Sequence, residues 1–183
     1  MILFHTSDRI IKKPDIHIGR SNADFGRGFY LTPDESFAGN WARERTASDI
    51  YVNKYELCTE GLRIRELSKD TEWYEYISGN RRGAKDLLAD HDAIIGPIAS
   101  DTLFETYGII TSGLLTADQA LQLLDIGPEY TQVAIKTERG AAALNWLEAR
   151  ILDRNQLENA KSQYTDAKAK FDEEFAAALD KMI

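Results

Sequence analysis

The sequence predicts an α+β domain that ends in a long amphipathic helix. Short strand-like segments alternate with helix-start signals but do not repeat as regular βαβ units. The chain has 183 residues, 43% of them hydrophobic and 28% charged, which is ordinary for a globular protein with a real core. In the C-terminal segment, apolar side chains recur every three or four residues from Leu157 to Met182, as on one face of a helix.

The first half of the chain is expected to alternate between short strands and helices. Strands are predicted at 2–6, 29–32, 49–57 and 62–67, with a polar loop at 8–24. The run Thr32-Pro33-Asp34-Glu35 places a capping hydroxyl before a proline and an acidic third residue, which predicts a helix starting after Thr32. Phe37 and Trp41 then share one face of that helix. Thr71 to Ile77 is rich in aromatic residues and is expected to be helical.

The second half is expected to hold two strands and several helices. Residues 92–101 form a buried strand broken by Gly96-Pro97, with Asp101 placed to cap a helix beginning at Thr102. Thr116 and Gln119 form a second capping box. A strand is predicted at 131–137, a helix at 138–152, and the amphipathic helix after it.

Composition excludes several classes of protein. The formal net charge of −8 argues against a broad, sequence-independent grip on nucleic acid, although residues 1–30 carry five basic and three acidic side chains. Cys58 is the only cysteine, so an intrachain disulfide is excluded. With three histidines and no ligand spacing, no metal site is expected. The sequence shows neither a leader nor a membrane-length apolar run, which predicts a soluble, cytoplasmic protein without a membrane partner.

Three strands each present a polar or aromatic side chain on the face that alternates with the apolar one. In the segment 2–6 this residue is His5, in 29–32 it is Tyr30, and in 131–137 it is Gln132. They form a site only if the strands are neighbours. Packing is the alternative reading for each of them, and a turn with a helix cap is the alternative for Gly96-Pro97 and Asp101.

The order and context of these residues resemble the ADP-ribosyltransferase superfamily, in its diphtheria-toxin and poly(ADP-ribose) polymerase branch with a His, Tyr and Glu signature. The nearest resemblance is to a bacterial domain-of-unknown-function family of that superfamily. Shared motifs are Pro14-Asp15-Ile16, Gly19-Arg20, the stretch "DFGRGFYLT" at 24–32, and "GPIASD" at 96–101. The match covers about residues 1–145.

The resemblance implies a fold and a chemistry. The fold would be split mixed and antiparallel sheets with peripheral helices, in a domain of residues 1–152 followed by a helix at 153–183 on the domain or a partner. The chemistry would be cleavage of the NAD glycosidic bond, with NAD as co-substrate and no metal. Tyr30 would stack on nicotinamide and His5 would bind the adenosine-side ribose. The other NAD contacts implied are Thr6, Arg20 (or Arg27), Phe25 (or Phe29), Gly26, Gly28 and Thr32.

The chain departs from the family pattern at Gln132, where related enzymes usually have glutamate. A carboxylate about 4 Å from the developing cation is worth about 4 kcal/mol at an effective dielectric near 20, so its loss costs on the order of a thousandfold in rate. Glutamine accepts the same hydrogen bond but is no general base. Glu129, and less readily Asp101 or Glu138, could supply a carboxylate. We therefore expect slow or acceptor-restricted transfer.

The function that the resemblance implies is mono-ADP-ribosylation of a macromolecule, as by a bacterial toxin of a toxin–antitoxin or phage-defence locus with an antitoxin partner. The acidic chain favours a protein acceptor, while the basic N-terminal segment leaves nucleic acid open. Two alternatives remain. One is a non-catalytic module that binds NAD or ADP-ribose, for which Gln132 is the argument. The other is an RNA 2′-phosphotransferase on the same fold, which would need a basic groove.

Overall fold

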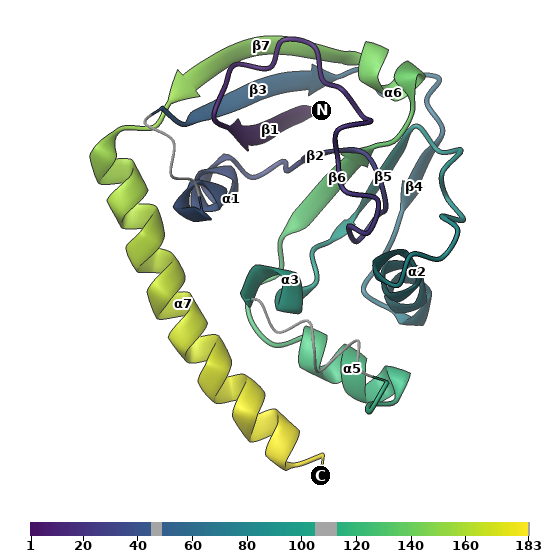
Figure 1. The fold of residues 1–183 in the computed structure, drawn as a ribbon, viewed down its shortest axis with the longest axis vertical. Helices are drawn as coiled ribbons and strands as arrows, with labels where there is room; N and C mark the ends of the chain where they lie inside the picture. Colours follow the sequence, from purple (N-terminus) through teal and green to yellow (C-terminus); the bar gives the residue numbers. More distant parts are fainter. Residues whose placement is uncertain (45–48, 105–112, 183) are drawn as a thin grey trace.

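The computed structural model describes residues 1–44, 49–104 and 113–182, which form an α+β fold built on two β-sheets (Figure 1). The first sheet has the strand order β1-β3-β7 and the second the order β2-β6-β5-β4. The strands are β1 (Ile2–Ser7), β2 (Phe29–Leu31), β3 (Tyr51–Leu57), β4 (Ile64–Glu66), β5 (Ala93–Pro97), β6 (Thr131–Ile135) and β7 (Leu144–Ile151). The helices are α1 (Glu35–Asn40), the 3-10 helix η1 (Trp41–Glu44), α2 (Thr71–Arg81), α3 (Ser100–Phe104), α5 (Ala117–Leu124), α6 (Glu138–Ala142) and α7 (Arg154–Asp180).

The two sheets meet where β1 passes the end of β2. Phe4 N–H donates to the Thr32 carbonyl at 2.8 Å, and Thr32 N–H donates to the Phe4 carbonyl at 3.0 Å. In the second sheet β6 lies between β2 and β5, antiparallel to both, while β4 runs parallel to β5. The strands that carry His5, Tyr30 and Gln132 are therefore successive neighbours in space.

Both faces of the second sheet are covered. Between the sheets lies a cluster that includes Leu3, Phe29, Tyr55 and Val133. The opposite face, with Ile94 and Ala134, packs on a larger cluster contributed by the helices; its aromatic members include Phe25, Trp73, Tyr76, Phe104, Phe171 and Phe175. Ala134 lies on the same face as Gln132, which the sequence alternation set apart from the apolar face; helices bury this face as well, so it also belongs to the core.

The predicted helix at 138–152 is wrong beyond its first turn. Only Glu138–Ala142 is helical, and Leu144–Ile151 forms the edge strand β7, antiparallel to β3. Residues 144–151 are good helix formers, but β3 offers them an antiparallel ladder with one register shift, and Leu144 is buried against the inter-sheet cluster. Tertiary pairing thus overrides local propensity.

Two helix starts also differ from the sequence prediction. Asp34, not Thr32, caps α1 by accepting from Phe37 N–H, and Thr32 is held instead in the bridge to β1. Asp101 lies inside α3, which begins at Ser100, two residues before the predicted start at Thr102. The capping box of Thr116 and Gln119 at the start of α5 is confirmed.

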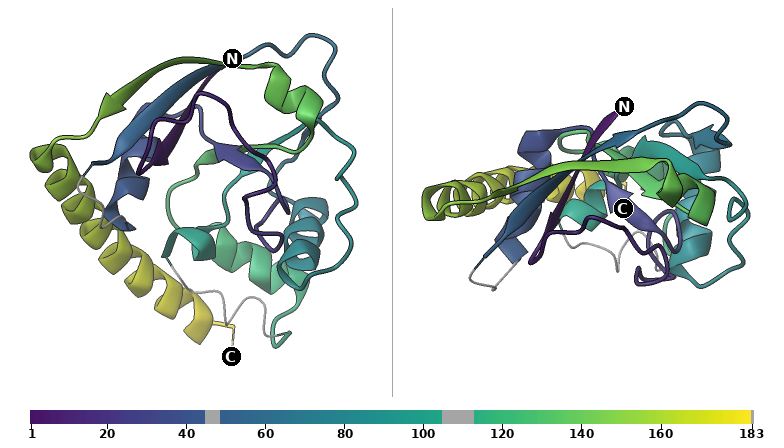
Figure 2. Two further views of the ribbon diagram at one scale, coloured as in Figure 1. Left: turned by 45° about the horizontal axis from the view of Figure 1, so that its top comes forward. Right: turned by 90° about the horizontal axis from the view of Figure 1, so that it is seen from above.

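The predicted C-terminal amphipathic helix is confirmed as α7, which runs along one side of the molecule (Figure 2). Its apolar face packs on the domain: the Phe171 ring stacks on Phe104 with centroids 4.3 Å apart, and Phe175 is buried beside it. In the part of the chain that the structure describes, no helix is long and apolar enough to cross a membrane.

Candidate functional site

His5 is anchored to the backbone of the neighbouring strand. Its Nδ1 lies 2.7 Å from the Tyr30 carbonyl oxygen. A carbonyl only accepts, so Nδ1 must carry the proton, and in the neutral ring Nε2 is then the basic nitrogen. The imidazole also packs on Phe29, with ring centroids 4.4 Å apart. This bond couples the first predicted site residue to the strand of the second.

Tyr30 projects to the helix-covered face of the second sheet, opposite to Phe29. Its hydroxyl donates to the Gly26 carbonyl at 2.6 Å and accepts from Phe25 N–H at 3.0 Å. Burial raises the pKa of the Tyr30 phenol, and the nearby Asp24 carboxylate raises it further. Tyr30 therefore stays protonated, and its hydroxyl closes the loop that precedes its own strand.

Gln132 shares a face with Tyr30, because Ala134 pairs with Tyr30 and Gln132 lies two residues from Ala134 on β6. Its side chain is 8% exposed, and its Nε2 donates to the Pro97 carbonyl at 3.5 Å, at the limit for a hydrogen bond. That carbonyl also accepts from Trp73 Nε1 at 3.1 Å. The amide of Gln132 is thus buried but held weakly.

The structure brings two of the three predicted catalytic side chains to one face and leaves the third on the other. Tyr30 and Gln132 lie on the helix-covered face, together with Thr32. The His5 ring lies on the inter-sheet side with Phe29 and reaches Tyr30 through its backbone. His5 and Tyr30 therefore meet at the junction of the two sheets without their side chains facing each other.

The remaining residues predicted to bind NAD have different environments. Thr6 is buried and its hydroxyl donates to the Ala38 carbonyl in α1. Phe25 is fully buried and stacks on Tyr76, so it belongs to the core. Arg20 is exposed. Two of the residues that could supply a carboxylate, Glu129 and Glu138, are exposed. The Oε1 of Glu138 lies 3.0 Å from His17 Nε2.

The glycines of the "DFGRGFYLT" stretch are required by the chain's own packing. A Cβ on Gly28 would lie 2.6 Å from the Ile135 carbonyl oxygen on β6, and one on Gly26 would overlap the Asp86 carboxylate. Gly26 also has a φ of +72°, a region that favours glycine. The packing of the chain therefore explains both glycines without a nicotinamide ring that approaches the backbone.

We expect Gly28→Val to impair folding more than NAD binding, because the new side chain meets backbone rather than a movable side chain. Thermal unfolding should show the loss directly, on the order of 3 kcal/mol or more. Gly39→Ala, whose added methyl meets nothing within 4 Å, is the matched control. A Gly28→Val protein with native stability that no longer binds NAD would return this glycine to the ligand site.

Buried side chains bind the backbone carbonyls of Asp24 and Phe25. Asn80 Nδ2 donates to the Asp24 carbonyl at 2.9 Å, and the Lys136 ammonium donates to the Phe25 carbonyl and pairs with Asp86. Asp86 also accepts from the Tyr76 hydroxyl at 2.8 Å. Burial lowers the pKa of Lys136, while Asp86 opposes this shift. The glycine stretch is thus a fixed part of the fold.

Arg81, which the sequence did not single out, joins two of the shared motifs. Its Nε donates to Asp24 at 2.8 Å, and its Nη1 and Nη2 donate to the two carboxylate oxygens of Asp101 at 2.7 and 3.0 Å. Burial would lower the pKa of Arg81, but the two carboxylates raise it. Asp101 is 0% exposed and paired with Arg81, so it is not a free general base, and its position inside α3 excludes the predicted cap. The available signal was that Arg81 is the only basic residue among 71–81.

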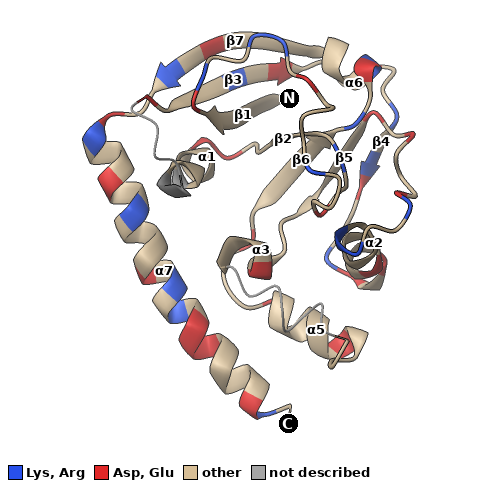
Figure 3. Ribbon diagram, viewed as in Figure 1, with Lys and Arg blue, Asp and Glu red and all other residues tan. Residues whose placement is uncertain are grey.

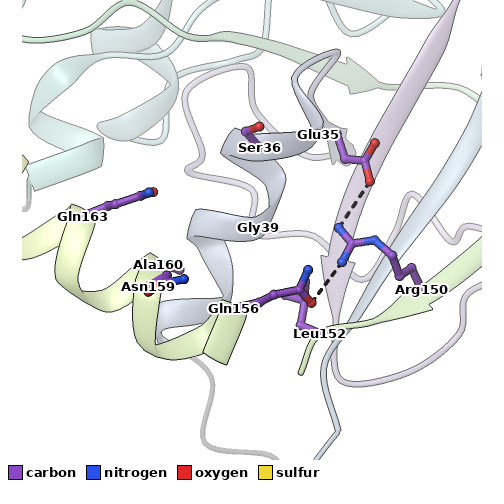
Figure 4. A pocket seen from close by; sticks show the side chains of 9 residues that line it. All are labelled: Glu35, Ser36, Gly39, Arg150, Leu152, Gln156, Asn159, Ala160 and Gln163. Atoms are coloured by element: carbon purple, nitrogen blue, oxygen red, sulfur yellow. Dashed lines mark hydrogen bonds and ion pairs between the residues drawn. The ribbon is translucent and has the colours of Figure 1, made fainter. Parts of the chain in front are cut away.

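Two cavities on the described part of the chain lie away from the predicted catalytic residues. A cavity of about 300 Å³ lies between α1, the end of β7 and α7, where Arg150 bonds to Glu35 at 3.2 Å and to Gln156 at 3.1 Å (Figure 4). A second, of about 360 Å³, lies between Gly127-Pro128 and α7. Neither is lined by His5, Tyr30 or Gln132. Among the described residues no His, Cys, Asp and Glu side chains gather in a group of three or more suited to a metal ion.

Comparison with known protein families gives a match. A family model described as "Protein of unknown function (DUF3990)" covers residues 1–146, and so includes both sheets except for the larger part of β7. The match stops before α7. No curated protein matches the chain.

Proposed function

The chain belongs to the DUF3990 family, and we propose that it is an NAD-dependent mono-ADP-ribosyltransferase. In this proposal the enzyme cleaves the bond between nicotinamide and ribose and transfers ADP-ribose to a macromolecule, with a protein favoured as the acceptor. It acts in the cytoplasm as a toxin of a toxin–antitoxin or phage-defence locus, under the control of an antitoxin protein.

The observation that carries the proposal is the hydrogen bond between His5 Nδ1 and the Tyr30 carbonyl at the junction of the two sheets. It joins residues 25 positions apart that the resemblance assigns to one NAD site, and it fixes the tautomer of His5. In the neutral tautomer Nε2 is a hydrogen-bond acceptor suited to a ribose hydroxyl. Gln132, on the strand next to β2, completes the proposed set.

The neutral side chain of Gln132 is the reason to expect slow cleavage of NAD. The side chain is neutral and the cleavage of NAD develops positive charge on the ribose, so Gln132 orients the sugar without stabilising that charge. Its present bond to Pro97, at 3.5 Å, is weak enough to be exchanged for one to a ligand hydroxyl. The proposal therefore predicts slow turnover.

Nicotinamide release from NAD by the purified protein is the direct test. We expect Gln132→Ala to reduce this rate about five- to hundredfold, because one hydrogen bond of roughly 1–3 kcal/mol to the reacting sugar is lost. Gln132→Glu restores a carboxylate and should raise NAD hydrolysis. Circular dichroism on both variants controls for folding, since Gln132 is buried. An unchanged rate in both would remove Gln132 from the reaction.

A second candidate is a module that binds NAD or ADP-ribose without cleaving it, favoured by the neutral, buried side chain of Gln132. A rise in melting temperature on adding NAD, with no nicotinamide released over hours, would select this candidate. If NAD neither raises the melting temperature nor is cleaved to nicotinamide, both candidates are wrong.

A further inference from the structure

Four exposed basic side chains near the glycine stretch have no acidic partner among the described residues. Many of the Lys and Arg residues that the structure describes, from Arg9 to Lys170, form ion pairs. Within residues 1–44, 49–104 and 113–182, Arg20, Arg27, Arg82 and Lys85 form none, and all four are exposed. On a chain of net charge −8, unpaired cations at one place are unexpected.

Packing brings these side chains to one surface. Gly19 lies against the backbone of Gly28, so the segments that carry Arg20 and Arg27 are adjacent. Asp24 pairs with Arg81, next to Arg82, and Gly26 lies against Asp86, next to Lys85. Figure 3 shows basic residues along this loop and at the neighbouring end of α2.

Three acidic side chains that pack beside this surface are already engaged by other cations. Asp24 and Asp101 bind Arg81, and Asp86 binds Lys136. Two large apolar side chains lie among the cations and face solvent: Ile18 is 82% exposed and Leu87 is 78% exposed. We call these six residues, Ile18, Arg20, Arg27, Arg82, Lys85 and Leu87, the loop–α2 surface.

We propose that the loop–α2 surface binds an acidic protein segment that also carries aliphatic side chains. Unpaired guanidinium groups favour carboxylates, and exposed Ile and Leu favour apolar contacts, which together are typical of a protein–protein interface. A surface for single-stranded nucleic acid would instead present aromatic rings for base stacking, and these six residues include none. The inference does not depend on the NAD chemistry.

The proposal is tested by fluorescence titration of the full chain against two labelled peptides and one labelled RNA. The probes are an amphipathic Glu/Leu peptide, the same peptide with Lys for Glu, and an oligouridine of similar length. We expect the Glu/Leu peptide to bind in a salt-sensitive manner. Arg82→Glu/Lys85→Glu should weaken this binding about tenfold or more, because like charges then face each other. Leu87→Ser should also weaken it, with no change of charge.

The matched control is Lys161→Glu/Lys181→Glu, which makes the same change of net charge at two exposed lysines of the α7 region. This control should change the affinity for the Glu/Leu peptide by less than about twofold, because it alters the net charge without changing the loop–α2 surface. Hydrogen exchange should show protection in 18–28 and 82–87. The proposal is overturned if the control weakens binding equally, if no acidic peptide binds, or if RNA binds more tightly through the same residues.

Discussion

Replacing Arg81 by methionine is expected to lower the free energy of unfolding by about 3–5 kcal/mol. The guanidinium is the shared partner of Asp24 and Asp101, whose side chains are 7% and 0% exposed. Without it two buried carboxylates lose their counter-charge and several hydrogen bonds at once. Urea denaturation measures the loss. Arg82→Met, next in the chain but exposed, is the control and should change the stability by less than about 0.5 kcal/mol.

The pH dependence of the loss distinguishes charge from packing. Burial already raises the pKa of Asp101, and Arg81 opposes that rise. Without Arg81 the folded-state pKa of Asp101 must rise further above its unfolded value near 4. A carboxyl group whose pKa is raised in the folded protein does not lower the stability below its unfolded pKa, where it is protonated in both states. It destabilises the folded protein as the pH rises through its folded-state pKa. The deficit of Arg81→Met should therefore narrow between pH 7 and about pH 4, whereas a deficit independent of pH would indicate lost packing alone.

The sequence predicts the elements whose pattern is local. The strands at 2–6, 29–32, 49–57 and 131–137 and the capping box of Thr116 are found close to where they are expected. The strand β7 could not be predicted, because its eight residues favour a helix until β3 supplies a partner. In the same way Thr32 could not be excluded as a cap until β1 was seen to bind it.

The candidate site is predicted only in part, for a similar reason. The neighbouring strands of His5, Tyr30 and Gln132 follow from the resemblance, but the face of each side chain depends on the sheet that the strand joins. Arg81 is 57 positions from Asp24 and 20 from Asp101, so no local pattern reveals their contact. Both glycines and the "GPIASD" aspartate then have structural explanations that their sequence context did not suggest.

Tyr30→Ala is expected to abolish NAD-dependent activity and also to lower stability by about 3 kcal/mol or more. The stability loss differs from the expectation based on strand parity, which placed Tyr30 off the core. The ring packs against the helix-covered core, and the hydroxyl binds both Phe25 N–H and the Gly26 carbonyl. A loss of activity in this variant alone would therefore not identify a stacking residue.

Tyr30→Phe separates the two roles of the side chain. It keeps the ring proposed to stack on nicotinamide and removes only the hydroxyl, so stability should fall by about 1–3 kcal/mol. Tyr55→Phe is the control, because the Tyr55 hydroxyl also donates to a loop carbonyl, that of Ile11, at 2.6 Å. If the ring binds nicotinamide, Tyr30→Phe should keep nicotinamide release within about tenfold of the wild type at a temperature where it is folded. Tyr30→Phe could instead be as inactive as Tyr30→Ala while Tyr55→Phe remains active. Nicotinamide release would then depend on the Tyr30 hydroxyl and the loop that it closes, and the proposed stacking role would be wrong.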